Sequence, residues 1–321
     1  MSKKEIYRSY CGANKELPIF LQDWWLDIVC GEDNWDVSLS FHKDGSIRGV
    51  WPYYIQKLMG FRISKHPELT PFLGVYIDYP KDMSRQSRRS SFERKTMYEL
   101  VKHMPSFLYF RQNFFPEFNN WLPLFWRKYH QTSYYTYLLS LKASEETLYQ
   151  NIDYKRKRQI KKALQFYQVI SSDDYQAIYK INKASYERKG MAMPYQFETL
   201  KQLDEILFKK KARKIYLCID EQKRVVAGAY IVKDYQKAYY LLGGVDLSQK
   251  VHYPMSLVFW HIIKEMRKEV DIFDFEGSVA RKIERVFRDY GGQRSPFYVI
   301  TKTRSRLADM AYLIFKGRRL S

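Results

Sequence analysis

Two carboxylates and a set of arginines lie close together in the stretch FDFEGSVARKIERVFRDYGG, residues 273–292. The residues before Gly277 predict a strand that carries Asp274 and Glu276, and the residues after it predict a helix. Because side chains alternate along a strand, the two acids face one side and the phenylalanines face the other. Polar groups at the carboxyl end of a strand in an α/β sheet commonly line a ligand crevice, and a glycine lets the chain turn tightly there. A carboxylate in this position can orient an amine or accept its proton.

The helix after this strand is predicted to carry a ridge of cations. Ser278 is a suitable N-cap and Gly291 a suitable stop. Arg281, Arg285 and Arg288 recur at positions i, i+4 and i+7, which places them on one side of the helix. In a second interpretation, Arg281 and Arg285 neutralise the two acids in a surface ion-pair network, or the acids cap the N-terminus of the helix. Ion pairs and catalytic sites both perturb carboxylates, so both interpretations stay open.

A second cationic segment, KRKRQIKK at residues 155–162, has six cations in eight positions. Lys155, Arg156 and Arg158 are predicted to bind phosphate groups of a substrate. The alternative is a solvated helix face without a ligand. Cations at 155–158 go almost fully round a helix, so one or more must face inward or form an ion pair.

Two loops provide further candidates. Arg188 precedes a Met-rich loop that can serve as a substrate lid or as a plain connection. His252 and Tyr253 come directly before Pro254, a favoured first residue of a helix, at the mouth of the inferred crevice. A histidine in an ordinary surface loop is the alternative for His252.

The chain shows no pattern for a metal site or a disulfide framework. Its three cysteines form no C-x-x-C pair, and its six histidines are scattered. We therefore expect no metal, no required cofactor and a reducing compartment.

The predicted elements recur in the same order in both halves of the chain. Each half has a helix, a hairpin, an apolar strand, a second helix and a final strand. Repetition on this scale indicates a duplicated α/β domain rather than a solenoid, whose repeats span roughly 20 to 50 residues. The first and second helices are expected at 19–30 and 92–104 in one half and at 176–190 and 254–266 in the other.

Length and composition agree with two folded domains. The chain has 321 residues, of which 45% are hydrophobic and 17% aromatic, so it can bury two sizeable cores. We predict an α/β (α+β) protein with two tandem domains, each a mixed twisted sheet flanked by helices. The predicted domains are 1–141 and 142–321, the second ending in a basic helix. The formal charge of +20 favours anionic partners: nucleic acid, phosphorylated small molecules or an acidic membrane surface.

Three stretches resemble the Fem family, whose members transfer amino acids from aminoacyl-tRNA to peptidoglycan precursors. They are YKRKRQIKKALQ at 154–165, HYPMSLVFWHIIKEM at 252–266 and the acidic strand with its helix at 273–292. The last is the most specific, because the family has a strand ending in Asp-Phe-x-Gly and then a helix ending in Phe-Lys-x-x-Phe-Gly. The repeated order of elements is similar to the GNAT acyltransferase fold. The resemblance covers most of residues 141–300, and the first half by architecture alone.

The resemblance implies two tandem GNAT-like domains and a role for each candidate residue. Where the family carries a lysine that steadies the acyl carbonyl as it becomes an oxyanion, this chain has Arg288, which keeps the charge but presents a planar fork. Asp274 or Glu276 would orient the amine or accept its proton. The predicted substrate-binding residues are Lys155, Arg156, Arg158, Arg188, His252, Tyr253, Arg281 and Arg285.

The stretch QKVHYPMS departs from the pyrophosphate loop of acetyl-CoA enzymes with this fold. That loop reads Gln/Arg-x-x-Gly-x-Gly/Ala, and its backbone amides cradle the pyrophosphate. Here Tyr253, Pro254 and Met255 stand where glycines are wanted, and a proline has no amide hydrogen to donate. This argues against ordinary binding of CoA.

Three functions follow as hypotheses. The first is an acyltransferase or aminoacyltransferase that acts on an amine, with aminoacyl-tRNA as donor and a peptidoglycan precursor as acceptor. The second is a CoA-dependent N-acyltransferase of a cell-envelope sugar or peptide. The third is a non-catalytic binding protein for nucleic acid or an acidic membrane. In that case, removing the carboxylates of Asp274 and Glu276 would leave its binding and biological effect unchanged.

The expected partners are an anionic donor or acceptor, such as tRNA, a nucleotide-linked peptide or CoA. Peripheral contact with an acidic membrane is a further expectation, and no stable protein partner is predicted. The N-terminal sequence lacks the apolar stretch of a signal peptide, and no run approaches the roughly 18 apolar residues of a membrane span. A cytoplasmic location is expected.

Overall fold

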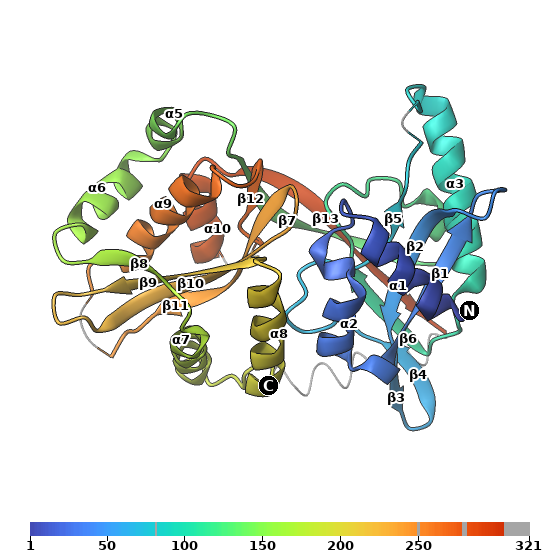
Figure 1. Ribbon diagram of the computed structural model, residues 1–321, viewed down its shortest axis with the longest axis horizontal. Helices are drawn as coiled ribbons and strands as arrows, with labels where there is room; N and C mark the ends of the chain where they lie inside the picture. Colours follow the sequence, from blue (N-terminus) through green and yellow to red (C-terminus); the bar gives the residue numbers. More distant parts are fainter. Residues whose placement is uncertain (81, 249–250, 278–280, 305–321) are drawn as a thin grey trace. The chain divides into compact units, whose positions relative to one another are not determined.

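The computed structural model describes residues 1–80, 82–248, 251–277 and 281–304, with the backbone alone for 281–282 (Figure 1). The chain divides into two compact units. Unit 1 is Met1–Tyr134 together with the chain from Pro296 onward, and unit 2 is Tyr135–Ser295. The chain enters unit 2 within strand β7 (His130–Ser140) and leaves it within β13 (Gln293–Thr303).

The two units therefore differ from the predicted ranges at their ends. The predicted joint at residue 141 falls directly after β7. At the other end, β13 pairs with β6 (Tyr109–Asn113) of unit 1 from Val299 to Thr303, so the chain returns to unit 1. The basic helix predicted from residue 301 onward is a strand as far as Thr303, and residues 305–321 lie outside the described part of the chain.

Unit 1 contains a three-stranded antiparallel sheet in the order β1-β2-β5, and strands β3, β4 and β6 pair beside one another. Helix α3 packs on β1 and β2, and α1 packs on β1. The core is aromatic and centres on Trp51, which contacts the rings of Phe110, Phe114 and Tyr129 edge-on or tilted. The helices and strands named here, together with α2 and α4, are α1 (Lys3–Ala13), α2 (Asp23–Cys30), β1 (Trp35–Phe41), β2 (Ile47–Tyr54), β3 (Gln56–Leu58), β4 (Phe61–Ser64), β5 (Tyr76–Ile77), α3 (Gln86–His103) and α4 (Leu122–Phe125).

Unit 2 is a mixed sheet in the order β7-β12-β11-β10-β9-β8. Its pairs are antiparallel except β11 with β12, which run parallel. Figure 1 shows α6 and α9 on one face of the sheet and α7 on the other. The elements of unit 2 are α5 (Glu145–Gln150), α6 (Tyr154–Ala163), β8 (Gln168–Ser172), α7 (Tyr175–Glu187), α8 (Phe197–Lys209), β9 (Arg213–Ile219), β10 (Val225–Lys233), β11 (Lys237–Val245), α9 (Pro254–Met266), β12 (Ile272–Asp274) and α10 (Arg281–Asp289).

The predicted repeat is confirmed. In unit 1 the order is α2, the β1-β2 hairpin, β5, α3 and β6, and in unit 2 it is α7, the β9-β10 hairpin, β11, α9 and β12. Gly49 and Gly228, which match in the two hairpins, are both pressed against a helix. A Cβ on Gly49 would lie 2.6 Å from Thr96 Cγ2 in α3, and one on Gly228 would lie 2.5 Å from Ile178 Cδ1 in α7.

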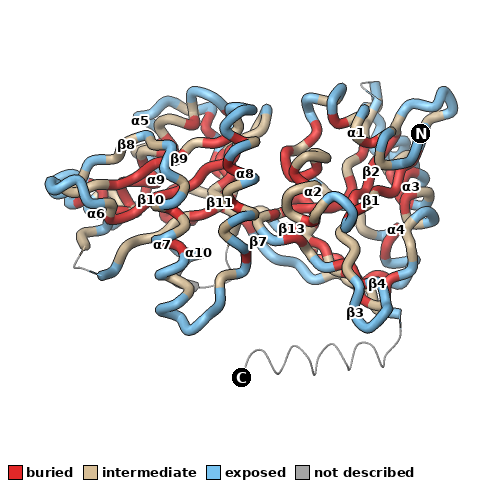
Figure 2. Tube along the Cα trace, turned by 60° about the horizontal axis from the view of Figure 1, so that its bottom comes forward, coloured by how far each residue is buried: buried red, intermediate tan, exposed pale blue. Residues whose placement is uncertain are grey.

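Helix α9 lies at the centre of unit 2. It begins at Pro254 as predicted, and its predicted apolar stripe is buried at Phe259, Ile262, Ile263 and Met266. Each such side chain contributes about 1.5–3 kcal/mol on burial. Figure 2 shows α9 and the central strands of unit 2 in the colour of buried residues. This packing fixes the start of α9 next to the strands that carry the acids.

Candidate functional site

The parallel ladder between β11 and β12 ends where the two acids begin. Its last pair is Tyr239 with Asp274, yet β11 continues to Val245 against β10. On β11 the register shifts, because Tyr230 faces Leu242 and the next residue, Ile231, faces Tyr240. Leu241 is therefore an extra residue, which marks a β-bulge. Beyond Tyr239 the two strands are no longer paired with each other.

Asp274 is fully buried and holds the turn after β12. Its Oδ1 accepts a hydrogen bond from the hydroxyl of Thr136 on β7 and another, at 2.8 Å, from the backbone amide of Glu276. A carboxylate that accepts such bonds at its own strand end fixes the local backbone. Asp274 therefore shapes the turn that presents Glu276.

Glu276 lies in a left-handed turn rather than in the strand. The strand ends at Asp274, and Glu276 has φ +55°, a region that costs a residue with a Cβ roughly 1–2 kcal/mol. The prediction of a strand through residue 277 was wrong at this point, because two left-handed residues in succession end the extended backbone. The two acids are adjacent, as predicted. They are brought together by the turn after β12, and not by the alternation of side chains along a strand.

Position 277 must be a glycine, because the backbone of β7 leaves no room for a side chain. It has φ +36°, and a Cβ there would lie 2.0 Å from the carbonyl oxygen of Tyr135 and 2.6 Å from Cα of Thr136. The turn therefore presses against β7 with no room for a side chain. The sequence prediction of a tight turn at Gly277 is confirmed.

The carboxyl group of Glu276 has an unusual environment. Its Oε1 atom is buried and has no hydrogen-bond partner among the described residues. Burial, and next the charge of Asp274, raise the pKa of Glu276 well above its ordinary value. The pKa of Tyr240 on β11 is also raised, mainly by burial and to a smaller extent by the charge of Glu276. The Glu276 carboxyl is therefore a buried acid whose neutral form is favoured.

Aromatic rings pack closely beside this turn. Phe275 stacks on Phe287 of α10 with the ring centres 5.0 Å apart, and Tyr240 contacts Phe259 edge-on at 5.0 Å. Phe259 also contacts Phe275 at 5.7 Å. These rings join β11, β12, α9 and α10 into one cluster, which excludes water from the side of the turn that they cover.

Arg288 is exposed and pairs along its own helix. Its Nη1 lies 3.4 Å from Oε1 of Glu284, one turn earlier, and the same Oε1 accepts a hydrogen bond of 2.5 Å from the hydroxyl of Tyr137. The structure therefore connects Arg288 to β7 through Glu284. Its side chain is 58% exposed, so the charge remains open to a ligand.

The other two arginines of this helix are less informative. Arg285 is exposed, and its Nε lies 3.9 Å from Oδ2 of Asp289, its nearest acid in the described part of the chain. The ion pair that the structure shows for Arg285 is with Asp289, and its pairing with Asp274 or Glu276 stays a hypothesis. The Ser278 cap and the side chain of Arg281 lie outside the described residues.

Helix α6 turns one of its predicted phosphate ligands inward. Arg156 Nε lies 3.3 Å from Oδ2 of Asp289 in α10, and the two side chains are 14% and 9% exposed. Its Nη1 donates to Gln159, which also accepts a bond from the Ser256 hydroxyl of α9. Arg156 is thus a structural link between helices, which fulfils the expectation that at least one cation on α6 forms an ion pair.

The other cations of α6 remain at the surface. Lys155 and Arg158 are exposed, and so are Lys161 and Lys162. Arg158 lies over the ring of Tyr154 at 5.9 Å, and Tyr154 is itself exposed. This face can meet an anionic ligand, in contrast to the buried Arg156.

His252 and Tyr253 lie directly before α9. The His252 ring stacks on Phe166 with centres 4.4 Å apart, and its amide donates to the hydroxyl of Tyr167. His252, Phe166 and Tyr167 border a cavity of about 390 Å³ that Asp220 and Arg224 also line. Tyr253 is exposed and adopts φ +60°, the left-handed conformation that a glycine would take without strain.

Arg188 is exposed at the end of α7, at the start of the Met-rich loop. The loop is tied down at Tyr195, whose hydroxyl bonds to Asn182, and the Asn182 amide donates to the carbonyl of Gly243 on β11. The loop therefore connects to the strand that carries Tyr240.

Sequence reasoning did not identify Thr136, Tyr240 or Glu284 as parts of this site. Thr136 lies 138 positions before Asp274, and Tyr137 lies 147 positions before Glu284. Such pairings come from the sheet order, in which β7 lies next to β12. No local signal in the sequence marks them. No group of His, Cys, Asp or Glu in the described residues could hold a metal ion.

The fold of unit 2 agrees with a known domain family. A family model described as an acetyltransferase (GNAT) domain matches residues 149–281, which lie within unit 2 and include both acids. Residues 149–281 are a GNAT domain. The chain is therefore an acyltransferase of the GNAT fold, and the predicted resemblance to this superfamily is confirmed. No curated protein sequence matches the chain.

Solved structures show the same fold over nearly the whole chain. The crystal structure of FemX matches with TM-score 0.65 and 11% identity, covering 93% of this chain and 96% of FemX. L-PGS from Bacillus licheniformis matches with TM-score 0.50 and 12% identity, covering 99% of this chain and 97% of that one. A C-terminal domain from Agrobacterium fabrum, named for a lysylphosphatidylglycerol synthetase, matches with TM-score 0.53 and 10% identity, covering 97% and 95%. At these identities the likeness shows the fold, and the Fem-like architecture of the chain is thereby established.

Proposed function

We propose that unit 2 transfers an aminoacyl group from an activated ester to an amine, and that Glu276 accepts the proton of the amine. The observation that carries this proposal is the buried Glu276 Oε1 atom, which has no hydrogen-bond partner among the described residues. A carboxyl group with a raised pKa is closer to the pKa of a neutral-pH base than an ordinary glutamate is. Asp274 is a positioning residue, because its Oδ1 holds the Glu276 amide.

The reaction forms one bond and breaks one. The amine nitrogen attacks the ester carbonyl, the new C–N bond forms, and the C–O bond to the donor breaks. The amine proton passes to Glu276 and ends on the hydroxyl of the leaving donor. Arg288 would polarise the carbonyl as charge develops on its oxygen.

The start of α9 favours aminoacyl-tRNA over CoA as the donor. Pro254 has no amide hydrogen, and the amide of Ser256 already donates to the carbonyl of Tyr253. These amides are therefore not open to a pyrophosphate. The exposed cations of α6 suit the phosphates of a tRNA acceptor end.

A peptidoglycan precursor with a free amine is the acceptor we propose. The support is the Fem-like pattern of the sequence together with the fold shared with FemX. A nucleotide-linked peptide is an anionic substrate, which agrees with the formal charge of +20.

One observation favours acyl-CoA as the donor instead. The family model that matches unit 2 is described as an acetyltransferase domain. We therefore keep a CoA-dependent N-acyltransferase of a cell-envelope sugar or peptide as the second candidate.

The test compares the two donors with one acceptor. Purified protein is mixed with a nucleotide-linked peptide and with either radiolabelled aminoacyl-tRNA or radiolabelled acetyl-CoA. We expect amide product from the tRNA donor alone. Product from acetyl-CoA alone would establish the second candidate, and product from neither donor, in protein that melts cooperatively, would contradict both.

A further inference from the structure

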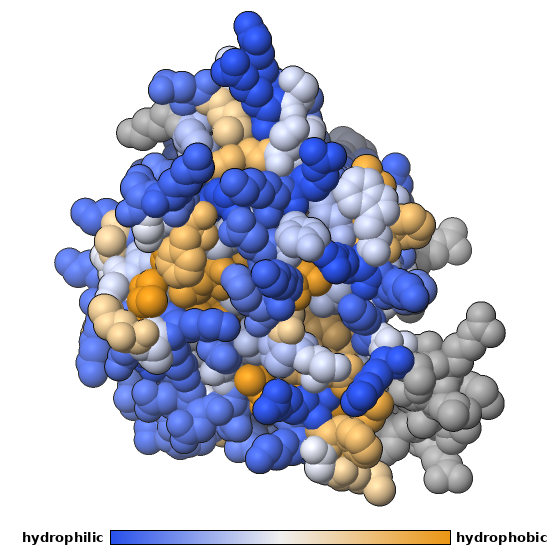
Figure 3. All heavy atoms as spheres, turned by 90° about the vertical axis from the view of Figure 1, so that its right-hand side faces the viewer, coloured by the Kyte–Doolittle hydropathy of each residue, from blue (hydrophilic) through white to orange (hydrophobic). Residues whose placement is uncertain are grey.

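Four large hydrophobic side chains are exposed together on helices α3 and α4 of unit 1. Tyr98, Leu122, Phe125 and Trp126 are between 51% and 58% exposed. Figure 3 looks at the unit 1 side of the molecule and shows apolar side chains at the surface between hydrophilic ones. Single exposed apolar residues are ordinary, but neighbouring ones indicate an interaction surface.

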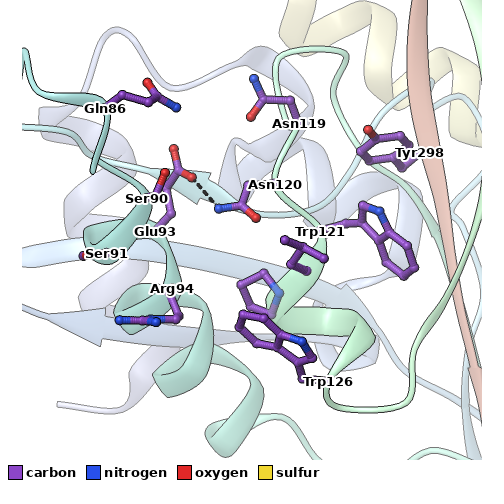
Figure 4. A pocket seen from close by; sticks show the side chains of 12 residues that line it. Gln86, Ser90, Ser91, Glu93, Arg94, Asn119, Asn120, Trp121, Trp126 and Tyr298 are labelled. Atoms are coloured by element: carbon purple, nitrogen blue, oxygen red, sulfur yellow. Dashed lines mark hydrogen bonds between the residues drawn. The ribbon is translucent and has the colours of Figure 1, made fainter. Parts of the chain in front are cut away.

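The contacts show that these residues are neighbours. The guanidinium of Arg127 lies over the ring of Tyr98, 4.4 Å from its centre. Leu122, Trp126 and Arg94 line one cavity of about 500 Å³, and Figure 4 shows Trp126 and Arg94 facing it from α4 and α3. Arg94 and Tyr98 are four residues apart on α3, so they share a face of that helix.

Cations surround the hydrophobic side chains. Arg94 and Lys102 flank Tyr98 on its own helix face, and Arg127 and Lys128 follow α4 directly. We call these four cations and the four hydrophobic residues the basic-aromatic patch. The pKa of nearby Lys302 is lowered, first by burial and then by the positive charges of Arg127 and Lys128. The cations therefore lie close enough together to affect one another.

No exposed acid offsets this charge within α3 or segment 119–128, both of which are fully described. The only acids there are Glu93 and Glu99. Glu93 is buried and accepts hydrogen bonds from Tyr79, Arg89 and Asn120, the last of which Figure 4 shows. Glu99 pairs with Arg48 at 2.6 Å, away from the patch.

We propose that the basic-aromatic patch docks unit 1 onto the surface of a membrane that contains anionic lipids. Trp, Tyr and Phe side chains favour the boundary between headgroups and acyl chains, where a ring can be half in water. Lys and Arg beside them attract anionic lipid, and the two signals together give firmer binding than either one alone. Leu122 favours a lipid surface over nucleic acid, since an aliphatic side chain offers neither a polar contact to a phosphate nor a ring on which a base could stack.

The cavity beside the patch suits a phospholipid headgroup. Its rim carries side-chain donors from Gln86, Ser90, Arg94 and Asn119 (Figure 4). Glu93 is the acid in this cavity. It forms an ion pair with Arg89, which balances its charge, and it also accepts hydrogen bonds from Tyr79 and Asn120. No described helix is long and apolar enough to cross a membrane.

The test is co-sedimentation of the full chain with two kinds of vesicle, pure phosphatidylcholine and phosphatidylcholine mixed with phosphatidylglycerol. We expect binding to the mixed vesicles and little to the neutral ones. Removing two cations, Arg127→Gln with Lys128→Gln, should weaken binding by about 25-fold, since each surface cation contributes about fivefold. The matched control is Lys3→Gln with Lys15→Gln, which removes the same charge from exposed sites elsewhere in unit 1 and should weaken binding much less.

A second variant separates insertion from charge. Phe125→Ser with Trp126→Ser keeps every cation and should release the protein from mixed vesicles at high salt, where charge attraction is screened. Equal losses in the control and patch variants would mean non-specific charge attraction and would overturn the proposal. Loss of tRNA binding with unchanged vesicle binding would assign the patch to nucleic acid, and loss of a dimer would assign it to a second copy of the chain. Transfer to a soluble acceptor should be unchanged in all these variants, so the outcome is independent of the proposed function.

Discussion

At the scale of single residues, two neighbouring acids have different environments in the same turn. Asp274 is fully buried, and its Oδ1 accepts from a hydroxyl and an amide. Glu276 has a buried oxygen without a partner among the described residues. Burial, and next the charge of Asp274, raise the pKa of the Glu276 carboxyl. The bonds that Asp274 accepts at Oδ1 are the reason why we propose Asp274 as the positioning residue and Glu276 as the base.

Glu276→Gln tests this difference by stability and by rate. Because the folded-state pKa of Glu276 is raised, the folded protein holds this proton more tightly than the unfolded chain does. Stability is therefore lost as the pH rises from the ordinary pKa of glutamate through the folded value. At neutral pH, Glu276→Gln should melt higher than the wild type by thermal unfolding, and the difference should vanish below about pH 4.

The same variant should transfer about 10² to 10⁴ times more slowly, the usual loss for a general base. Asp274→Asn is the comparison, and it should melt lower, because a buried acceptor arrangement is disturbed. A Glu276→Gln protein that melts lower at neutral pH would show that the charged carboxylate is stabilised after all.

Arg288→Met tests the carbonyl role. Its ion pair with Glu284 is exposed, and such pairs contribute about 0–1 kcal/mol, so the melting temperature should hardly change. If Arg288 polarises the carbonyl, turnover should fall by about 10² to 10³ with nearly unchanged substrate affinity. Arg288→Lys should recover much of the rate, since an ammonium can take the same role. Steady-state kinetics that show full turnover in Arg288→Met would remove this residue from the mechanism.

At the scale of elements, the site depends on how helices and strands are tied together. α6 joins α10 through Arg156 and Asp289, and α6 joins α9 through Gln159 and Ser256. The Tyr290 hydroxyl after α10 donates to the carbonyl of Ser256, which closes the connection. These bonds hold the start of α9 and the end of α10 in register with the turn at Glu276.

Arg156→Met should cost up to roughly 3–5 kcal/mol of unfolding free energy, because the buried Asp289 then keeps only the exposed Arg285, at 3.9 Å, as a cationic partner. Denaturant unfolding measures the change. Lys155→Met removes an exposed cation from the preceding position of the same helix and should change stability by less than about 0.5 kcal/mol. Adding Asp289→Leu to Arg156→Met should restore much of the loss, since replacing both partners of a buried pair is often neutral. Equal changes of unfolding free energy in Arg156→Met and Lys155→Met would mean that the Arg156–Asp289 ion pair does not stabilise the fold.

At the scale of the whole molecule, positive charge occurs on both units. In unit 2 it lies on the exposed side of α6, and in unit 1 it lies in the basic-aromatic patch. The chemistry of the two surfaces differs, because the patch combines cations with exposed hydrophobic side chains and α6 carries a denser row of cations. We therefore expect each surface to prefer a different anionic partner.

Charge reversal on α6 should weaken tRNA binding and reduce its dependence on salt. Changing Lys155, Arg158, Lys161 and Lys162 to Glu should lower the slope of log affinity against log salt by about 0.7 for each lost single-strand phosphate contact. Filter binding over a range of salt concentrations gives the slope. The Arg127→Gln and Lys128→Gln variant of the patch serves as control and should leave the slope unchanged. An unaltered slope in the α6 variant would make that helix a solvated face.

The sequence alone was enough to predict the repeated α/β architecture and the GNAT-like fold. Periodic apolar residues, hairpin turns and glycines are local signals, so the start of α9 at Pro254 and the tight turn at Gly277 could be predicted. The adjacency of Asp274 and Glu276 could also be predicted, because the two residues are close in the chain. The number of cations on α6 indicated that at least one of them would form an ion pair.

Tertiary structure decided which groups each acid meets and which cation of α6 turns inward. Thr136 meets Asp274 and Asp289 meets Arg156 from more than a hundred residues away, and no local pattern encodes such pairs. The left-handed backbone of Glu276 follows from the contact of Gly277 with β7, not from the propensity of the residue. Burial and long-range hydrogen bonds set the pKa of a carboxyl group, so the chemical identity of the site appears only when the strands are assembled.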